Sequence, residues 1–286
     1  MSTSNKIIKY ISISFAIFLT ITIIEAILSG IYGIYSMVKP SNDNNNDNDD
    51  DDVVEIKEVI DSDISNIDID SDISNIDMDL IYNSLVLKYG DKLLIEGENS
   101  NIQYEIEDGT LIVKEKKYKW NGRNKKRELS ITIPRDVVLN KLNIDSGAGT
   151  VIIDGLSLVS MDLNLGAGST KVKGITCSRA DIDTGAGELI IDKGNINNLD
   201  LNIGVGDVNI SGILTGNNKI DTGIGALNLN LSDSSNNYTF KVEKGIGKVL
   251  IDNTKVEDNE VIGSGSGSSY IVLNGGIGDI KVNFDK

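Results

Sequence analysis

The sequence predicts an all-β protein, a parallel β-solenoid of ~19-residue repeats that stands behind one N-terminal transmembrane helix. Two observations predict the solenoid, and an apolar stretch at residues 10–38 predicts the helix. A Gly-x-Gly triplet recurs every 19 residues between residues 147 and 225. Apolar and polar residues alternate on both sides of each triplet, as they do in β-strands. The chain divides into five segments, which are residues 1–9, 10–38, 39–52, 53–139 and 140–286.

Residues 10–38 form an apolar stretch that contains a single charged residue, Glu25. About 20 apolar residues are enough for a helix to cross the hydrocarbon core of a membrane. Two lysines precede the stretch and one follows it, which weakly favours a cytoplasmic N-terminus and an extracytoplasmic C-terminal domain. Because the stretch is longer than the ~7–15 apolar residues of a signal peptide, we expect an uncleaved anchor. Glu25 then lies near one end of an over-long stretch, pairs in a helix dimer, or has a function of its own.

Residues 39–52 are an Asn- and Asp-rich linker. Such a composition cannot bury a core, so we expect a solvated spacer. The run of Asp lacks the Gly and the closing Glu of an EF-hand loop, and it therefore does not predict a specific calcium site. The sequence predicts no metal and no cofactor elsewhere in the chain.

Residues 53–139 show a series of short strand patterns. A nonapeptide at 62–70 is repeated with one substitution at 71–79, and in both copies apolar residues alternate with Asp. Asp108-Gly109 stands between two alternating runs and predicts a two-residue hairpin turn.

Residues 140–286 carry the repeats. Positions five and seven before the second Gly of a triplet, and two and four after it, are mostly apolar, so each unit reads as strand, corner and strand. The glycines suit a corner that needs positive φ or has no room for a Cβ atom. We expect the middle residue of the triplet to tuck into the corner. The triplets begin at Gly147, Gly166, Gly185, Gly204, Gly223, Gly245 and Gly276.

Three further features complete the predicted solenoid. The Gly/Ser-rich insertion at residues 253–269 predicts a loop, Phe284 is expected to cap the open end of the core, and Cys177 is expected to be a buried structural thiol. A calcium-binding β-roll is disfavoured because only two triplets are followed by Asp. One outer wall is predicted to be polar and acidic, formed by Asp162, Asn164, Asp181, Asp183, Asp200, Asn202, Asp221, Asn228 and Asn230.

A family resemblance follows from these motifs. The run Asp-Gly-Thr-Leu-Ile-Val at 108–113, the run Ile-Thr-Ile-Pro at 131–134 and the serial Gly-Ala-Gly units resemble the putative-adhesin β-strand-repeat family of bacteria. The resemblance covers residues 53–286. It implies a β-solenoid of unknown function in an envelope-associated protein, often behind one membrane helix, and it assigns no site residues.

The segment from Lys114 to Arg127 is basic, with eight Lys or Arg among its fourteen residues. Asn121-Gly122 predicts a hairpin turn within it. Cations beside aromatic rings suit an anionic polymer or lipid headgroups; the alternative is a solvated hairpin whose charges offset the acidic neighbours. The candidate contact residues are Lys116, Lys117, Tyr118, Lys119, Trp120, Arg123, Lys125, Lys126 and Arg127.

Composition excludes several classes of function. The chain has no His and one Cys, which rules out an imidazole base, a His-ligated metal, an intramolecular disulfide and a thiolate zinc site. A net charge of −16 argues against nucleic acid as a partner. We therefore expect a non-enzymatic, single-pass cell-membrane protein that acts as an adhesin or interaction module.

Its predicted partners are the membrane and a cell-surface polymer or envelope protein, and a homo-oligomer is a further candidate. The alternative function is a regulatory or scaffolding role in envelope-stress signalling through the helix and the basic hairpin. A polysaccharide-cleaving enzyme is disfavoured because the sequence indicates no groove lined by aromatic residues.

Overall fold

The structure is a computed structural model that describes residues 58–59, 64–68, 73–98, 101–116, 127–263 and 269–284. The fold below is that of the unit Glu55–Lys286. The predicted anchor and acidic linker, with residues 1–9, lie outside the described residues. Within the described ranges, no helix has the length and apolarity needed to cross a membrane.

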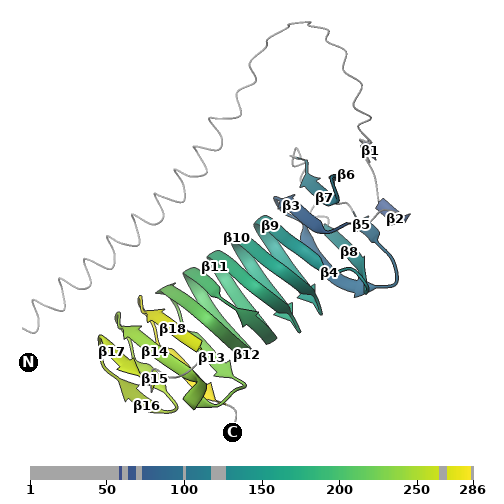
Figure 1. Ribbon diagram of the computed structural model, residues 1–286. Coiled ribbons are helices and arrows are strands. Elements are labelled where there is room, and N and C mark those ends of the chain that lie inside the picture. Colours follow the sequence, from purple (N-terminus) through teal and green to yellow (C-terminus); the bar gives the residue numbers. More distant parts are fainter. Residues whose placement is uncertain are drawn as a thin grey trace, which may run out of the picture. The chain divides into compact units, whose positions relative to one another are not determined.

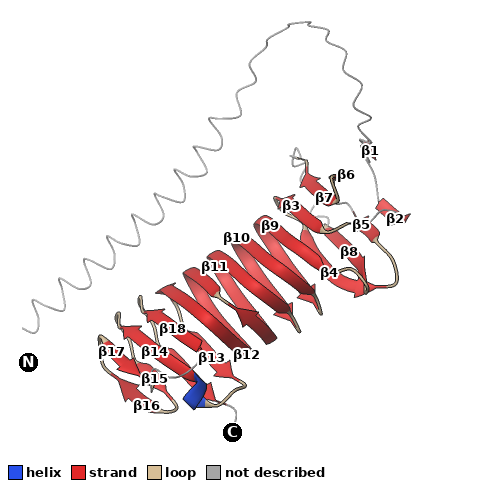
Figure 2. Ribbon diagram, viewed as in Figure 1, coloured by secondary structure: helices blue, strands red, loops and turns tan. Residues whose placement is uncertain are grey.

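The described chain is built almost entirely from strands (Figure 2). The one helical element among them is the 3₁₀ turn η1 (Ser235–Asn237). The strands are β1 (Glu58–Val59), β2 (Ile64–Asp68), β3 (Asn75–Leu80), β4 (Ser84–Gly90), β5 (Leu94–Glu98), β6 (Ile102–Glu107), β7 (Thr110–Glu115), β8 (Glu128–Pro134), β9 (Leu139–Asp154), β10 (Ser157–Lys173), β11 (Thr176–Asn197), β12 (Leu199–Ile224), β13 (Leu227–Leu231), β14 (Tyr238–Glu243), β15 (Val249–Ile251), β16 (Thr254–Val256), β17 (Glu260–Ile262), β18 (Ser269–Asn274) and β19 (Ile280–Phe284).

Strands β9 to β12 stack in parallel as successive coils of a solenoid (Figure 1). Their register repeats the 19-residue spacing of the sequence, since Leu142 lies opposite Met161, and Met161 lies opposite Ala180. Each of these long strands runs through its Gly-x-Gly corner, so one strand forms both arms of a coil. The parallel β-solenoid predicted from the repeat is confirmed.

The core lies inside the coils and is formed by every second residue of each arm. Burying these side chains contributes about 25 cal/mol for each Å² of apolar surface removed from water. The Asp and Asn residues predicted for the outer wall are all exposed or half-buried, which confirms the inward and outward assignment. Four stacked examples of fully buried positions are Ile144, Leu163, Ile182 and Leu201.

The first coil is formed by β3 and β4, which pair in parallel with the two arms of β9. Strands β7 and β8 stack on the other side of this coil, again in parallel. They are covered in turn by the antiparallel strands β6 and β5. Antiparallel strands over the last parallel layer limit the open edge that a solenoid end would offer for pairing.

The predicted hairpin turn at Asp108-Gly109 is confirmed. It joins β6 to β7, and both residues have positive φ, at 46° and 70°. Positive φ at both central positions is the geometry of a type I′ turn.

The basic segment between β7 and β8 connects differently from the predicted hairpin. Strand β7 pairs with β3 and β6, whereas β8 pairs with β4 and β5. The strands that flank the segment, β7 and β8, therefore stack on different arms of the first coil, and they do not pair with each other. The turn at Asn121-Gly122 lies outside the described residues and stays a prediction.

The order of the last two coils departs from the order of the sequence. Strands β18 and β19, at the C-terminus, pair with β12 and β13 on one side and with β14 and β15 on the other. The C-terminal coil is thus inserted inside the stack. The prediction of a loop at residues 253–269 is wrong in its first part, because β16 and β17 lie there and pair with β15 and β14.

An aromatic cluster closes this end of the core. The ring of Phe284 lies 5.8 Å from that of Tyr238 and 6.1 Å from that of Phe240. Phe284 is half-buried and packs against the core. Phe284 contributes to closing the core, as expected. It does so from β19, which lies between β13 and β15 and not at the outer end of the stack.

Candidate functional site

The Gly-x-Gly corners stack directly on one another along one edge of the solenoid. A Cβ atom placed on Gly168 would lie 1.8 Å from the carbonyl oxygen of Gly149 in the coil below, and the φ of Gly168 is 146°. Both reasons given for glycine, positive φ and a lack of space, therefore apply at this position.

The middle residues of the triplets point away from the core, contrary to the prediction that they tuck into the corner. Ala167 and Ala186 are exposed, and in later coils larger apolar side chains follow. The flanking glycines lie against the backbone of the neighbouring coil, and the middle side chain is directed outward between them. We call the four consecutive large residues the corner ridge. With their exposed fractions they are Val205 (48%), Ile224 (37%), Ile277 (44%) and Ile246 (73%).

The order of the ridge in space follows the order of the coils. Ile224 bridges to Ile277, and Ile277 bridges to Ile246. The glycines around Ile224 lie over those around Val205. Successive coils are about 4.8 Å apart, so the ridge is a straight apolar line across four coils.

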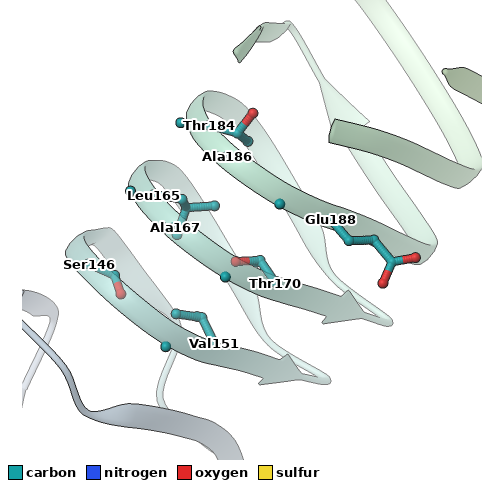
Figure 3. Close-up of a pocket in the computed structure, with 13 residues that line it drawn as sticks. Ser146, Val151, Leu165, Ala167, Thr170, Thr184, Ala186 and Glu188 are labelled. Atoms are coloured by element: carbon teal, nitrogen blue, oxygen red, sulfur yellow. The ribbon is translucent and has the colours of Figure 1, made fainter. Parts of the chain in front are cut away.

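Beside the alanine corners lies a shallow depression that spans three coils (Figure 3). Its walls are largely glycine and alanine, with the hydroxyl groups of Ser146, Thr170 and Thr184. Glu188 supplies the one carboxyl group among its lining residues. Glycoside cleavage ordinarily uses a pair of carboxyl groups, so this depression does not fit a polysaccharide-cleaving site.

Two aspartates form hydrogen bonds that brace the corner. Asp207 Oδ1 accepts a hydrogen bond from the backbone N–H of Ala226 at 2.9 Å. Asp279 Oδ1 accepts one from the backbone N–H of Lys248 at 2.8 Å. Each aspartate follows a triplet and ties its coil to the next, which explains their positions without a metal ion. Within the described ranges, no three carboxylate or thiol groups are arranged to hold a metal.

The acidic wall contains a row of three aspartates on consecutive coils, in which Asp181 lies between Asp162 and Asp200. Burial, followed by the negative charges of Asp200 and Asp162, raises the pKa of the Asp181 carboxyl above its ordinary value. In the neighbouring row an amide alternates with a carboxylate, and Asn202 Nδ2 donates to Asp183 Oδ1 at 2.8 Å. The amide relieves the repulsion that stacked carboxylates would otherwise have.

Asp181→Asn is expected to stabilise the solenoid at neutral pH by up to about 1 kcal/mol, since charges near water are strongly screened. A raised carboxyl pKa means that ionisation costs more in the folded than in the unfolded state, so stability falls as pH rises through the titration of Asp181. The advantage of the variant should therefore disappear below the ordinary Asp pKa of about 3.9.

The measurement is the midpoint of thermal unfolding of the wild type and of Asp181→Asn. It is repeated between pH 3 and pH 7 in steps of about one pH unit, a range that includes the ordinary Asp pKa. Asp154→Asn is the control, because its partners on the adjacent coils are Lys88 and Lys173. That change should give no gain. A midpoint for Asp181→Asn that is unchanged at pH 7 would contradict the repulsion.

Of the nine candidate residues in the basic segment, the structure describes Lys116 and Arg127, and the others lie outside the described residues. Arg127 is directed inward. Its Nη1 lies 3.2 Å from Oε1 of Glu115, and the side chains are 15% and 0% exposed. Arg127 therefore belongs to a part-buried ion pair with Glu115.

Glu115 has a structural role that the sequence interpretation did not single out. Its burial could have been found from alternation, because Leu111 and Val113 precede it at the inward positions of β7. Its second carboxylate oxygen, Oε2, caps the corner of the first coil. It accepts hydrogen bonds at 2.8, 2.8 and 3.0 Å from the backbone N–H groups of Ile81, Tyr82 and Asn83.

Cys177 is buried, which confirms its predicted structural role. Burial raises the pKa of its thiol, and the thiol donates to the carbonyl oxygen of Arg179 at 2.7 Å. A protonated, enclosed thiol is a poor nucleophile.

Comparison with known proteins identifies the family. The profile of the family described as Toastrack DUF4097 matches residues 48–284. No curated protein matches the chain.

Six chains of solved structures are similar to this chain, among them the following two. One is a "putative cell adhesion protein" from Clostridium sporogenes ATCC 15579, with 19% identity, a TM-score of 0.35, and coverage of 77% of this chain and 98% of the other. The second is a "putative adhesin" from Bacteroides fragilis NCTC 9343, with 19% identity, a TM-score of 0.40, and coverage of 78% and 98%. The solenoid of stacked Gly-x-Gly corners and the profile match over most of the chain lead to one conclusion: this protein belongs to the Toastrack DUF4097 family, in agreement with the resemblance seen in its sequence.

Proposed function

We propose that the chain is a non-enzymatic envelope protein, anchored by residues 10–38, that presents its solenoid outside the membrane as an adhesin or interaction module. The observation that carries this proposal is the corner ridge. Soluble proteins rarely leave large apolar side chains exposed in a continuous line unless the line binds something. The depression beside it has a single carboxyl group, Glu188, which suits contact better than hydrolysis.

The repeated geometry supports an interaction role for a second reason. Each coil presents its outer residues in the same register as the coil before it, so a partner meets a regularly spaced series of contacts along the stack. Weak contacts of this kind add up when many are made at once.

The test is protease treatment of intact cells that carry an epitope after Lys286. We expect the epitope to be lost while a cytoplasmic marker protein survives, which would restrict the partner to surface polymers or envelope proteins. If the epitope survives on intact cells but is digested after lysis, the orientation is wrong. The solenoid would then be a membrane-tethered cytoplasmic scaffold.

A further inference from the structure

We propose that the corner ridge is a self-association surface, which binds the corner ridge of a second copy of this chain in an antiparallel, two-fold arrangement. The ridge is straight and composed of four β-branched side chains, with exposed fractions between 37% and 73%. β-branched side chains have few rotamers to lose when they are immobilised. A straight ridge of this kind can lie alongside an identical one.

Charged residues on one flank of the ridge determine the orientation. Asp207 lies two residues after Val205, at one end, and Lys248 lies two residues after Ile246, at the other. Both side chains are exposed. The ion pairs within the described part of the chain involve other residues. Ala226 and Asp279 hold the same position on the two coils between them. The flank therefore reads Asp207, Ala226, Asp279 and Lys248 in space, with its basic residue at one end and an acidic residue three coils away at the other.

An antiparallel arrangement joins these unlike ends. The two-fold axis lies in the interface, at right angles to the ridge, and passes between Ile224 and Ile277. It reverses the direction of the ridge in the second copy. Each flank of one copy then faces the equivalent flank of the other. Asp207 of one copy then faces Lys248 of the other, and symmetry produces this pair twice. Complementary charges of this kind select the orientation of an interface more than they add to its affinity.

The parallel arrangement is opposed by the same charges. An axis along the ridge would exchange the two flanks, and Lys248 would then face Lys244, which lies two residues before Ile246. Two lysines would meet in place of two ion pairs. The charges therefore discriminate between the two ways in which identical ridges can pack.

The association should be weak in dilute solution. Four side chains offer less than the roughly 800 Å² per partner of a standard stable interface. Attachment of both copies to one membrane, as the sequence predicts, would raise their effective concentration. The experiment should therefore trap the contact in membranes that contain the full chain.

Cysteine pairing tests both the contact and its direction. Full-length chains that carry Asp207→Cys and Lys248→Cys, with different tags, are expressed together and oxidised in isolated membranes. We expect a mixed disulfide between the two tags. Each variant alone should give little disulfide. In the antiparallel arrangement the same position in the two copies is separated by three coils, or about 14 Å along the ridge. A disulfide needs Cα atoms within about 7 Å of each other. The native Cys177 is buried and should not compete.

A matched pair of apolar substitutions separates the ridge from apolar surface in general. Adding Ile224→Asp to both chains should lower the mixed disulfide at least tenfold. Val159→Asp changes a side chain that is 49% exposed and lies off the ridge, and it should leave the yield unchanged.

Charge exchange provides a second readout that requires no cysteine. These chains contain no engineered cysteine, and a short photocrosslinker that does not react with amines is placed at residue 226. Lys248→Asp should lower the yield of crosslinked dimer. Adding Asp207→Lys to the same chain should restore that yield.

Three outcomes would overturn the proposal. The first is a yield of mixed disulfide no greater than the yield from either variant alone. The second is a loss of mixed disulfide in Val159→Asp as large as that in Ile224→Asp. The third is a yield of the Lys248→Cys homodimer greater than that of the mixed disulfide. None of these depends on which side of the membrane the solenoid occupies, so a negative result here leaves the protease experiment to decide the proposed function separately.

Discussion

Replacing Gly168 by alanine is expected to destabilise the solenoid by more than about 4 kcal/mol, beyond the usual range of single substitutions. The new methyl group would lie 1.8 Å from the carbonyl oxygen of Gly149 and 2.9 Å from its carbonyl carbon. These are backbone atoms held on both sides by the parallel register, so they cannot move away as the end of a side chain could. The φ of 146° adds backbone strain, since alanine rarely adopts it.

Urea unfolding of the purified full chain in detergent measures this effect. Gly174→Ala is the matched control, because Gly174 also has positive φ, at 58°, but its nearest neighbour to an added Cβ atom is the Cα of Gly155 at 3.8 Å. That change should lower the free energy of unfolding by only roughly 1–2 kcal/mol, the cost of holding an alanine in the left-handed backbone conformation. Equal unfolding midpoints for the two variants would show that the stacked corners can separate, and that the close approach is not a constraint.

Replacing Glu115 by alanine is expected to cost about 3–5 kcal/mol, the usual result of breaking one side of a buried ion pair. In the later coils, the corner of one coil packs on the backbone of the coil before it. The corner at residues 81–83 begins the series, and its three N–H groups are satisfied by the Glu115 carboxylate instead. Removal of the carboxylate leaves three backbone N–H groups, of which that of Asn83 is buried, and the Arg127 guanidinium without this acceptor. The buried groups then carry a desolvation cost.

The loss should be concentrated at the N-terminal end of the stack. Hydrogen exchange followed by mass spectrometry should show faster exchange of the amides at residues 81–83 in Glu115→Ala, with the coils of β10 to β12 protected as before. Glu107→Ala is the control, because Glu107 is an exposed glutamate on the neighbouring strand β6. If the exchange of residues 81–83 stays slow, water or another group satisfies these donors and Glu115 is not the cap.

A double-mutant cycle separates the two roles of Glu115. Arg127→Met removes the charged partner while keeping most of the apolar stem. If the capping of N–H groups dominates, Glu115→Ala should remain costly in the Arg127→Met background, whereas a role limited to the ion pair predicts a much smaller cost there.

The sequence predicted the repeating part of this protein in detail. A fixed spacing of 19 residues determined the register of β9 to β12, because parallel coils of equal length place equivalent residues opposite each other. Alternation predicted which side chains are buried, and Asp108-Gly109 predicted a turn that the backbone confirms. These features depend on neighbours along the chain or on a strict period, and both are visible in one dimension.

The tertiary structure decided what periodicity leaves open. The two nearly identical nonapeptides both supply strands, yet β2 pairs antiparallel with β5 while β3 pairs parallel with β7 and β9. The same alternation fits either partner, so pairing depends on which edge is available.

The ends of the solenoid show the same limit. Nothing in the repeat period indicates that β18 and β19 insert inside β14 and β15, or that the Glu115 carboxylate pairs with Arg127 and caps the corner at residues 81–83. A repeat determines its own interior, where every coil meets a copy of itself. At the ends that copy is missing, and the open edges and unpaired N–H groups are satisfied by whichever distant strand or side chain packs there with the lowest free energy.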